Sequence, residues 1–366
     1  MSTATEMTLD NLYGGINSTR KTDFVAPRSK MQVKQSGGQI NVVAGDMVDL
    51  PMTQHAIGQL DSSIAPGFIT YGKWLRENDR NDVYVENVNK ALIVETKKAQ
   101  IRTITKSLDG RESSTARAIL SDVFKPIDDD IVFGTAIPVI GQFSDKFKAL
   151  GGNRTDTKSF LKIITRNPVM SVETGGETRE FSAGFIMSNS EVGMGFCEFM
   201  AFFTDHFCNN GIIFSKMVVA DVRYAHRGAR ITTDFGQVMD DRIKRAEIES
   251  IRSIISEAAK TACSFDSYGE IKTLIQSSIE KRIEGHNYSA LLEGVGKQFQ
   301  LNQQDVEQIK TYFNPDDGNL FGVQAAVTRL AQESESYDRK IQLVNIGGQI
   351  LSMSDRTWNS INALSA

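Results

Sequence analysis

The feature that most constrains the fold is a series of short apolar segments between Arg179 and Arg230. Each segment has the length of a strand, and the turn signal Asn209-Asn210-Gly211 separates the second from the third. No gap between them is long enough for a crossover helix, so the series predicts neighbouring antiparallel strands of one sheet. The predicted strands are residues 181–188, 196–203, 212–219 and 222–226.

Other segments predict the remaining elements. Residues 97–106 alternate in the manner of a half-buried strand, residues 160–165 form a further strand, and residues 113–124 fit either a helix or a strand. Apolar residues at helical spacing predict helices on both sides of these strands. We therefore expect an α+β protein, with a central antiparallel sheet from about residue 97 to residue 235, flanking helices and a helical C-terminal region. The predicted helices cover residues 50–65, 68–75, 83–96, 131–143, 248–262, 268–285, 302–313, 321–331 and 337–351.

Three regions follow from this division. Residues 1–45 are polar and glycine-containing, and we expect a flexible or loosely docked N-terminal arm. An alternative stays open, in which a segment such as Gln39–Val43 adds a strand to the sheet. Residues 46–262 are expected to form the α+β core domain, and residues 263–366 the helical C-terminal region.

Composition indicates the class of protein. Hydrophobic residues make up 40% of the 366 residues and charged residues 23%, as in soluble globular proteins. No apolar run reaches the ~18 residues of a membrane helix, and the first residues lack the features of a secretory signal. Three cysteines without regular spacing argue against a disulfide framework. We expect a cytoplasmic protein without membrane association.

The net charge of -4 does not by itself indicate a nucleic-acid-binding protein. Its distribution is uneven, because residues 246–366 carry 11 Lys and Arg against 16 Asp and Glu. The preceding residues are therefore close to neutral, which leaves room for a local basic surface there.

Five segments occur in an order that resembles a known family. They read LPMTQHAIGQL, TARAILSDVFKPIDDDIV, FSAGFIMSNSEVG, DHFCNNGIIF and VRYAHRGAR. This order resembles the phage/plasmid-like protein family called domain of unknown function 932, over roughly residues 45–260. The resemblance implies an accessory protein of phages or other mobile genetic elements, encoded near DNA-metabolism genes, and supplies no catalytic residues. The matching positions are Arg117, Ser121, Asp122, Asn189, Ser190, Glu191, Gly193, Cys208, Asn210, Gly211 and His226.

Basic residues on two predicted strands suggest a binding surface. If residues 222–227 are extended, Arg223 and Arg227 lie on one strand face, and Lys98, Arg102 and Lys106 share a face of the earlier strand. Two such faces on one sheet would form a trough that matches a sugar–phosphate backbone, with aromatic residues stacking on bases. The alternative is a solvated surface whose charges pair with nearby acids. The predicted nucleic-acid-binding residues are Lys98, Arg102, Lys106, Arg117, Arg223, Tyr224, His226, Arg227 and Arg230.

Cysteine and histidine residues offer weaker candidates. Cys197, His206, Cys208 and His226 lack the paired spacing of zinc sites, so we expect buried cysteines and no bound metal. Cys208 with His226 as its base would make a nucleophile, but nothing in the spacing requires that contact.

Polar residues between predicted elements have ordinary structural interpretations. Asn189 to Gly193 predicts a tight loop, although Glu191 is open to a role in binding a metal or a substrate. Asp128 to Asp130 predicts acids at a helix N-terminus. No phosphate-binding glycine loop is present in the sequence, and we expect no cofactor.

The leading hypothesis is therefore a phage or mobile-element accessory protein that binds single-stranded DNA during replication or recombination. We expect binding rather than catalysis, and oligomerisation would multiply the contacts of a net-acidic chain. Two alternatives remain. One is a protein-interaction or assembly factor, such as an inhibitor of a host defence protein. The other is a metal-dependent hydrolase or nuclease that uses Glu191, Asp122 or the Cys208–His226 pair.

Overall fold

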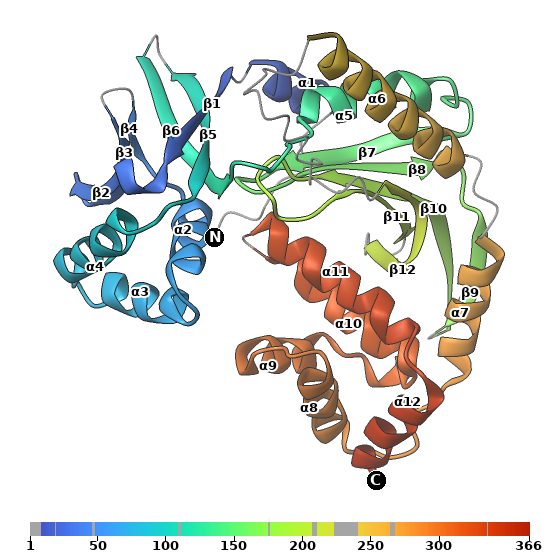
Figure 1. Cartoon of the computed structure of the whole chain (residues 1–366). Helices are drawn as coiled ribbons and strands as arrows, with labels where there is room; N and C mark the ends of the chain where they lie inside the picture. The colour runs from blue at the N-terminus through green and yellow to red at the C-terminus, as the bar shows by residue number, and fades with distance from the viewer. Residues whose placement is uncertain are drawn as a thin grey trace.

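A lobe of two small sheets and three helices forms the N-terminal part of the molecule. The computed structural model describes residues 9–18, 20–45, 48–108, 111–174, 176–206, 211–222, 241–263, 268–334 and 336–366. Strands β1 (Arg20–Pro27), β5 (Lys98–Leu108) and β6 (Arg111–Ser121) make one antiparallel sheet in the order β1-β5-β6. Strands β2 (Met31–Ser36), β3 (Gln39–Ala44) and β4 (Val48–Pro51) make the other. We call residues 20–121 the N-terminal lobe (Figure 1).

Helices α2 (Gln54–Ile64), α3 (Phe68–Glu77) and α4 (Asn81–Ile93) close the core of this lobe. Thr53 caps α2, since its hydroxyl accepts the Ala56 N–H at 3.2 Å. Leu60 and Val88 are fully buried against strand residues such as Val42 and Ile101. Because β4 takes up Leu50 and Pro51, the helix begins later than the sequence pattern predicts.

The expectation of an N-terminal arm differs from the structure. Residues 20–44 contain three strands, and the side chains of Met31, Val33 and Val42 are buried. The open alternative of a strand near Gln39–Val43 corresponds to β3. Alternating apolar residues make these strands amphipathic, and their buried face belongs to the lobe's own core rather than to the larger sheet.

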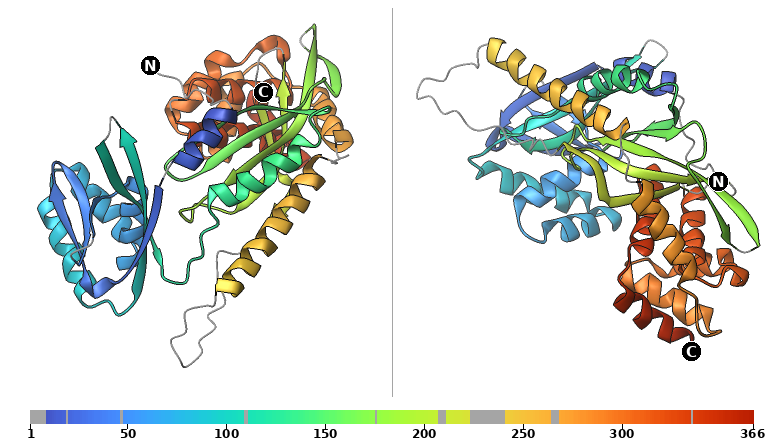
Figure 2. Two further views of the ribbon diagram at one scale, coloured as in Figure 1. Left: turned by 90° about the horizontal axis from the view of Figure 1, so that it is seen from above. Right: turned by 90° about the vertical axis from the view of Figure 1, so that its right-hand side faces the viewer.

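The central part of the molecule is a six-stranded antiparallel sheet, which we call the large sheet. Its strand order is β12-β11-β10-β8-β7, and β9 pairs with β10 beside this path. The N-terminal lobe stands to one side of it (Figure 2). The strands are β7 (Phe147–Arg154), β8 (Ser159–Thr165), β9 (Met170–Thr174), β10 (Glu177–Asn189), β11 (Cys197–Asp205) and β12 (Gly211–Val222).

Helices cover both faces of the large sheet. On one face, α1 (Leu9–Ser18), α5 (Asp129–Gly141), α6 (Asp241–Cys263) and α7 (Tyr268–Glu280) bury the first core. On the other, α10 (Leu320–Gln332) and α11 (Tyr337–Leu351) bury the second (Figure 1). Helices α8 (Tyr288–Gln298), α9 (Gln303–Tyr312) and α12 (Asp355–Asn362) extend this C-terminal helical region. Short 3₁₀ turns lie at Arg28–Lys30, Pro315–Asp317 and Ala363–Ser365.

The α+β class is confirmed, with antiparallel sheets, flanking helices and a helical C-terminal region. In the described residues, three sheets take the place of the single central sheet that was expected. Residues 113–124, which fitted a helix or a strand, are mostly strand β6. No helix in the described residues has the length and apolarity needed to cross a membrane.

Candidate functional site

The predicted basic trough required two strand faces on one sheet. Strand β5, which carries Lys98, Arg102 and Lys106, belongs to the small β1-β5-β6 sheet, whereas β12 is an edge strand of the large sheet. Strand β5 and the described strand β12 therefore belong to different sheets. Lys98 is exposed, and the side chain of Lys106 lies outside the described residues. Also outside them lie Arg223, Tyr224, His226, Arg227 and Arg230.

Arg102 is buried instead of facing solvent, with 4% of its surface exposed. Its Nε donates to Asp23 at 3.0 Å, and its Nη2 donates to Asp128 at 2.7 Å. Its Nη1 donates to the carbonyl oxygen of Glu191 at 2.7 Å. Burial by itself lowers the pKa of Arg102, but Asp128 and Asp23 outweigh it and raise that pKa. The predicted phosphate contact is corrected, because the guanidinium is enclosed and already neutralised.

Arg117 is also turned inward, with 5% exposure. Its Nη1 donates to Glu191 Oε2 at 2.7 Å and its Nη2 to the Asp156 carbonyl at 3.1 Å. Lys21 contacts the other carboxylate oxygen, Oε1. The expected phosphate-binding role of Arg117 is therefore also corrected. We call Lys21, Arg117, Asp129, Arg154 and Glu191 the Glu191 cluster.

The N-terminus of α5 completes this cluster. The backbone N–H of Asp129 donates to Glu191 Oε1 at 2.8 Å, as expected for an anion at a helix N-terminus. Arg154 Nη2 lies 3.5 Å from Glu191 Oε2. Burial by itself raises the pKa of Glu191, but Lys21 and Arg117 overcome that effect and lower the pKa to about 2. Glu191 is therefore ionised at neutral pH and already paired with Lys21 and Arg117. Its carboxylate is occupied by these cations, whereas the sequence had left open a role in binding a metal or a substrate.

Asp129 lies beside Glu191, and its pKa is shifted in the opposite direction. Ser159 Oγ donates to one of its oxygens at 2.6 Å and Asn189 Nδ2 to the other at 2.8 Å. Burial and the neighbouring charge of Glu191 nevertheless raise the pKa of Asp129 to about 6. The two adjacent carboxyl groups therefore differ in charge state between about pH 2 and pH 6, because Glu191 binds Lys21 and Arg117 whereas the cation beside Asp129, Arg154, lies 3.6 Å away.

The loop from Ser190 to Phe196 fixes the cluster between the two halves of the molecule. His55 Nε2 and Gln59 Nε2, both on α2, contact the Val192 carbonyl at 3.0 and 2.8 Å. Ser190 Oγ accepts the Met194 N–H at 2.9 Å, which agrees with the predicted loop-stabilising role. Four positions of the family resemblance meet here: Arg117, Asn189, Ser190 and Glu191. The sequence segments that carry the resemblance include these four residues. Their mutual contacts could not be predicted, because they join elements far apart in the sequence.

Cys197 is a buried strand residue, as the sequence predicted for the cysteines. Burial, followed by the charges of Asp129 and Glu198, raises the pKa of its thiol to about 12. Among the described residues, no group of three or more His, Cys, Asp or Glu side chains is placed to hold a metal ion. Cys208 and His226 lie outside the described residues.

A pocket with two lysines lies on the face of the large sheet that α10 and α11 cover. We call it the lysine pocket; its volume is about 390 Å³. Lys162 on β8 is 5% exposed, and its Nζ lies 5.6 Å from the ring centroids of Phe202 and Tyr337. Lys340 Nζ lies 6.0 Å from the centroid of the same Tyr337 ring. The residues that line the lysine pocket are Leu150, Lys162, Phe202, Thr204, Gly211, Thr328, Ala331, Gln332, Lys340 and Val344.

None of the described residues that line this pocket is acidic. The nearest acid along α11, Asp338, contacts the hydroxyls of Thr155 and Thr157 at 3.3 and 3.2 Å. The sequence pattern alone did not reveal this site. A signal was present, since Lys162 interrupts an otherwise apolar strand, but its partners on α10 and α11 are more than 160 residues away.

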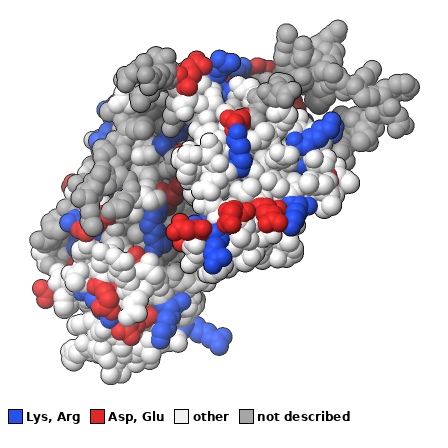
Figure 3. Space-filling model, turned by 90° about the vertical axis from the view of Figure 1, so that its left-hand side faces the viewer, with Lys and Arg blue, Asp and Glu red and all other residues white. Residues whose placement is uncertain are grey.

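The charges of the described surface are mixed on the face shown in Figure 3. Lys and Arg side chains there lie close to Asp and Glu side chains, and large areas carry neither. That face therefore presents no broad basic surface in its described part.

No protein-family model matches the chain, and neither a curated protein nor a solved structure matches it. The resemblance to domain of unknown function 932 thus rests on the five sequence segments alone.

Proposed function

We propose that this protein binds single-stranded nucleic acid and that the lysine pocket holds one nucleotide of the strand. The observation that carries the proposal is the pair Lys162 and Lys340 in a pocket whose described lining has no acid. From the sequence resemblance, we propose that such binding serves the replication or recombination of a phage or another mobile element.

The chemistry of the pocket suits a nucleotide. Ammonium groups bind phosphate as point charges, and the hydroxyls and amide of Thr204, Thr328 and Gln332 offer hydrogen bonds to sugar or base edges. The volume of about 390 Å³ lies within the range of small-ligand pockets. Phe202 and Leu150 form an apolar part of the pocket wall. The arrangement therefore matches a ligand with both anionic and flat apolar parts.

Binding at few phosphates predicts a shallow salt dependence. Each phosphate neutralised on a single strand contributes about -0.7 to the slope of log K against log salt. Two lysines therefore predict a contribution of about -1.4, and removal of Lys340 is expected to reduce it by about 0.7.

The test is fluorescence anisotropy with labelled single-stranded oligothymidine between about 50 and 200 mM salt. Lys340→Gln is expected to weaken binding about tenfold, and Lys340→Glu more. Lys90→Gln is the matched control, because Lys90 is an exposed helical lysine on α4, paired with Glu86. Lys162→Gln is a second variant, which needs a check of its folded state because Lys162 is buried.

Two outcomes would overturn the proposal: no binding at the lowest salt, or equal affinity and slope for wild type and both Lys340 variants. Binding of thymidine monophosphate but not of the oligonucleotide would reassign the pocket to a free nucleotide.

A protein-interaction role is the second candidate, favoured by an exposed aromatic pair on α3. Trp74 is 53% exposed and stacks on Tyr71 with ring centroids 6.4 Å apart. Ile69, also exposed, adds to this apolar surface. Exposed aromatic groups of this kind mark protein interfaces. Sedimentation velocity tests self-association. An oligomer that Trp74→Ala converts to a monomer supports this role. An oligomer of unchanged mass in the variant shows that the aromatic pair does not form the interface.

A further inference from the structure

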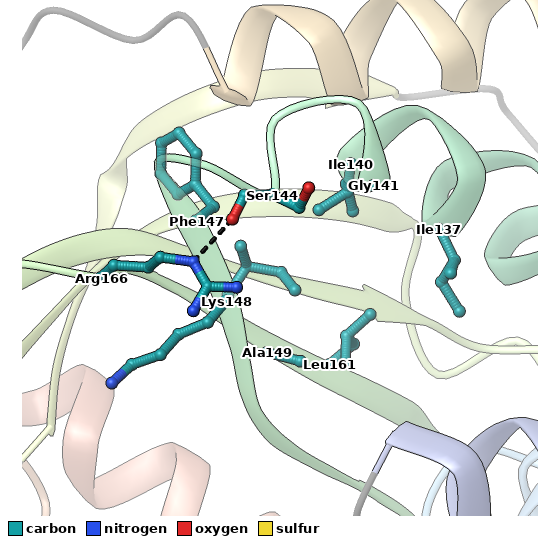
Figure 4. A pocket seen from close by; sticks show the side chains of 10 residues that line it. Ile137, Ile140, Gly141, Ser144, Phe147, Lys148, Ala149, Leu161 and Arg166 are labelled. Carbon is teal, nitrogen blue, oxygen red and sulfur yellow. Dashed lines mark hydrogen bonds between the residues drawn. The ribbon is translucent and has the colours of Figure 1, made fainter.

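A second pocket lies on the opposite face of the large sheet from the lysine pocket. It opens between the C-terminal half of α5 and the β7–β8 edge, and its volume is about 220 Å³ (Figure 4). Along β8, Leu161 and Ile163 point to this side and Lys162 to the other, as strand alternation requires. We call this site the α5 pocket; a ligand here does not compete with one in the lysine pocket.

The walls of the α5 pocket are apolar. Ile137 and Ile140 project from α5, and Leu161 and Ile163 from β8. An engineered cavity of about 150 Å³ is known to hold benzene, so this pocket has room for a single ring or a short alkyl chain. The apolar part of a ligand is therefore limited in size.

The polar part of the lining is cationic. The guanidinium of Arg166 lines one end of the pocket, whereas the ammonium group of Lys148 points away from the apolar lining residues (Figure 4). None of the described lining residues is acidic. The Nε of Arg166 donates to the Ser144 carbonyl at 2.6 Å, which holds the guanidinium at one end of the pocket (Figure 4). The backbone N–H of Arg166 donates to the carbonyl oxygen of Lys146 at 2.8 Å, which fixes the position of the Arg166 backbone.

The remaining edge of this guanidinium is oriented for an anion. Within the described part of the chain, Nη1 and Nη2 of Arg166 have no hydrogen-bond partner, and the side chain is solvent-exposed. A planar guanidinium binds a carboxylate through two parallel N–H···O bonds, a geometry that an ammonium group lacks. An apolar chamber with a positioned arginine at its end selects a molecule with one anionic end and one apolar end.

We propose that the α5 pocket binds a small monocarboxylate that carries a short alkyl chain or one aromatic ring. The carboxylate pairs with Arg166, and the tail lies between Ile140 and Leu161. Each methylene added to the tail is expected to tighten Kd by about fourfold until the pocket is full. Affinity then stops rising, or falls, because a longer tail does not fit.

The experiment is isothermal titration calorimetry of the full chain with butanoate, hexanoate, octanoate and benzoate. Hexanol and hexylamine are the ligand controls, since they keep the tail and replace the anion. Arg166→Gln is expected to weaken hexanoate binding about tenfold or more. Arg356→Gln on α12 is the matched control, because that arginine is exposed and distant in the chain.

A second variant tests the location. Gly141 lines the pocket, and a Cβ there would meet no atom within 4 Å. The backbone therefore accommodates the Cβ of a larger residue, and the side chain in Gly141→Leu is expected to fill the pocket and abolish binding of all four acids. Circular dichroism checks that both variants are folded.

Three results would overturn the proposal. They are the absence of saturable binding of any of the four acids at millimolar concentration, equal affinity for hexanoate and hexanol, and unchanged hexanoate binding in folded Arg166→Gln protein. The lysine-pocket proposal is unaffected by any of them, because its variants and ligands are different.

Discussion

Arg117 and Glu191 form a buried ion pair that joins the two halves of the molecule. Arg117 Nη1 lies 2.7 Å from Glu191 Oε2, and their side chains are 6% and 1% exposed. Arg117 belongs to β6 of the N-terminal lobe, whereas Glu191 follows β10 of the large sheet. Lys21 and the N-terminus of α5 bind the same carboxylate. With Arg154 on β7, the carboxylate therefore binds groups from four separate segments.

Glu191→Gln is expected to lower the free energy of unfolding by about 3 to 5 kcal/mol, because it leaves buried cations without their anion. Urea denaturation followed by circular dichroism measures the change. Glu86→Gln is the control: its pair with Lys90 is exposed and joins residues four apart on α4, so a loss below about 0.5 kcal/mol is expected. Equal effects of the two substitutions would show that the Glu191 cluster contributes no more than a surface pair.

Asp129 gives the protein a pH dependence opposite to that of Glu191. The folded pKa of Asp129 is raised to about 6, above the unfolded value of about 3.9, so the folded state binds this proton more tightly. Its contribution to stability is therefore present at low pH and is lost as pH rises from about 4 to 6. Glu191, with its pKa lowered to about 2, contributes stability above about pH 4 that is lost on acidification.

Asp129→Asn removes the titration and is expected to flatten the fall in stability between about pH 4 and 6. The difference between variant and wild type should change by roughly 2 to 3 kcal/mol across that interval. Urea midpoints at several pH values measure it. Parallel curves for the two proteins would contradict a raised pKa at this position.

The strand pattern predicted β8, β10, β11 and β12 of the large sheet because local information decides them, whereas β7 and β9 were not predicted. Alternation in β10 and the apolar run of β11 reflect which side chains are buried, and Asn302 at the start of α9 forms the capping box that helix starts favour. Assignment of strands to sheets was less successful. The sequence of residues 97–106 does not indicate whether β5 pairs with β1, as it does, or with a strand of the large sheet.

The charged residues show the same limit. Arg102 was expected on a basic strand face with Lys98 and Lys106, and Arg117 was expected to bind nucleic acid. Their burial depends on Asp23, Asp128 and Glu191, which come from three other parts of the chain. Pairing of this kind is invisible to spacing along one strand. The lysine pocket was missed for the same reason.

Cys197 and Cys263 are expected to resist alkylation in the folded protein. Burial raises the pKa of the Cys263 thiol to about 11 and, with Asp129 and Glu198, that of Cys197 to about 12. The reactive thiolate is therefore rare at neutral pH. Iodoacetamide treatment at pH 8 followed by peptide mass spectrometry measures modification, with urea-unfolded protein as the positive control. Rapid modification of Cys197 in folded protein would contradict its buried environment.

Gly184 in the middle of β10 is expected to tolerate no side chain. A Cβ at this position would lie 1.9 Å from the Ile163 carbonyl oxygen and 2.7 Å from the Ile164 Cα, both on the paired strand β8. Backbone atoms of a central strand cannot move aside without breaking the hydrogen bonds between the strands, so Gly184→Ala should lower the free energy of unfolding by about 3 kcal/mol or more.

Gly58→Ala is the matched substitution, because Gly58 lies within helix α2 and its Cβ would meet nothing within 4 Å. That change should raise stability by about 0.5 to 1 kcal/mol through helix propensity. Thermal unfolding of both variants distinguishes the cases, and a stable Gly184→Ala protein would mean that β8 and β10 are not paired in this register.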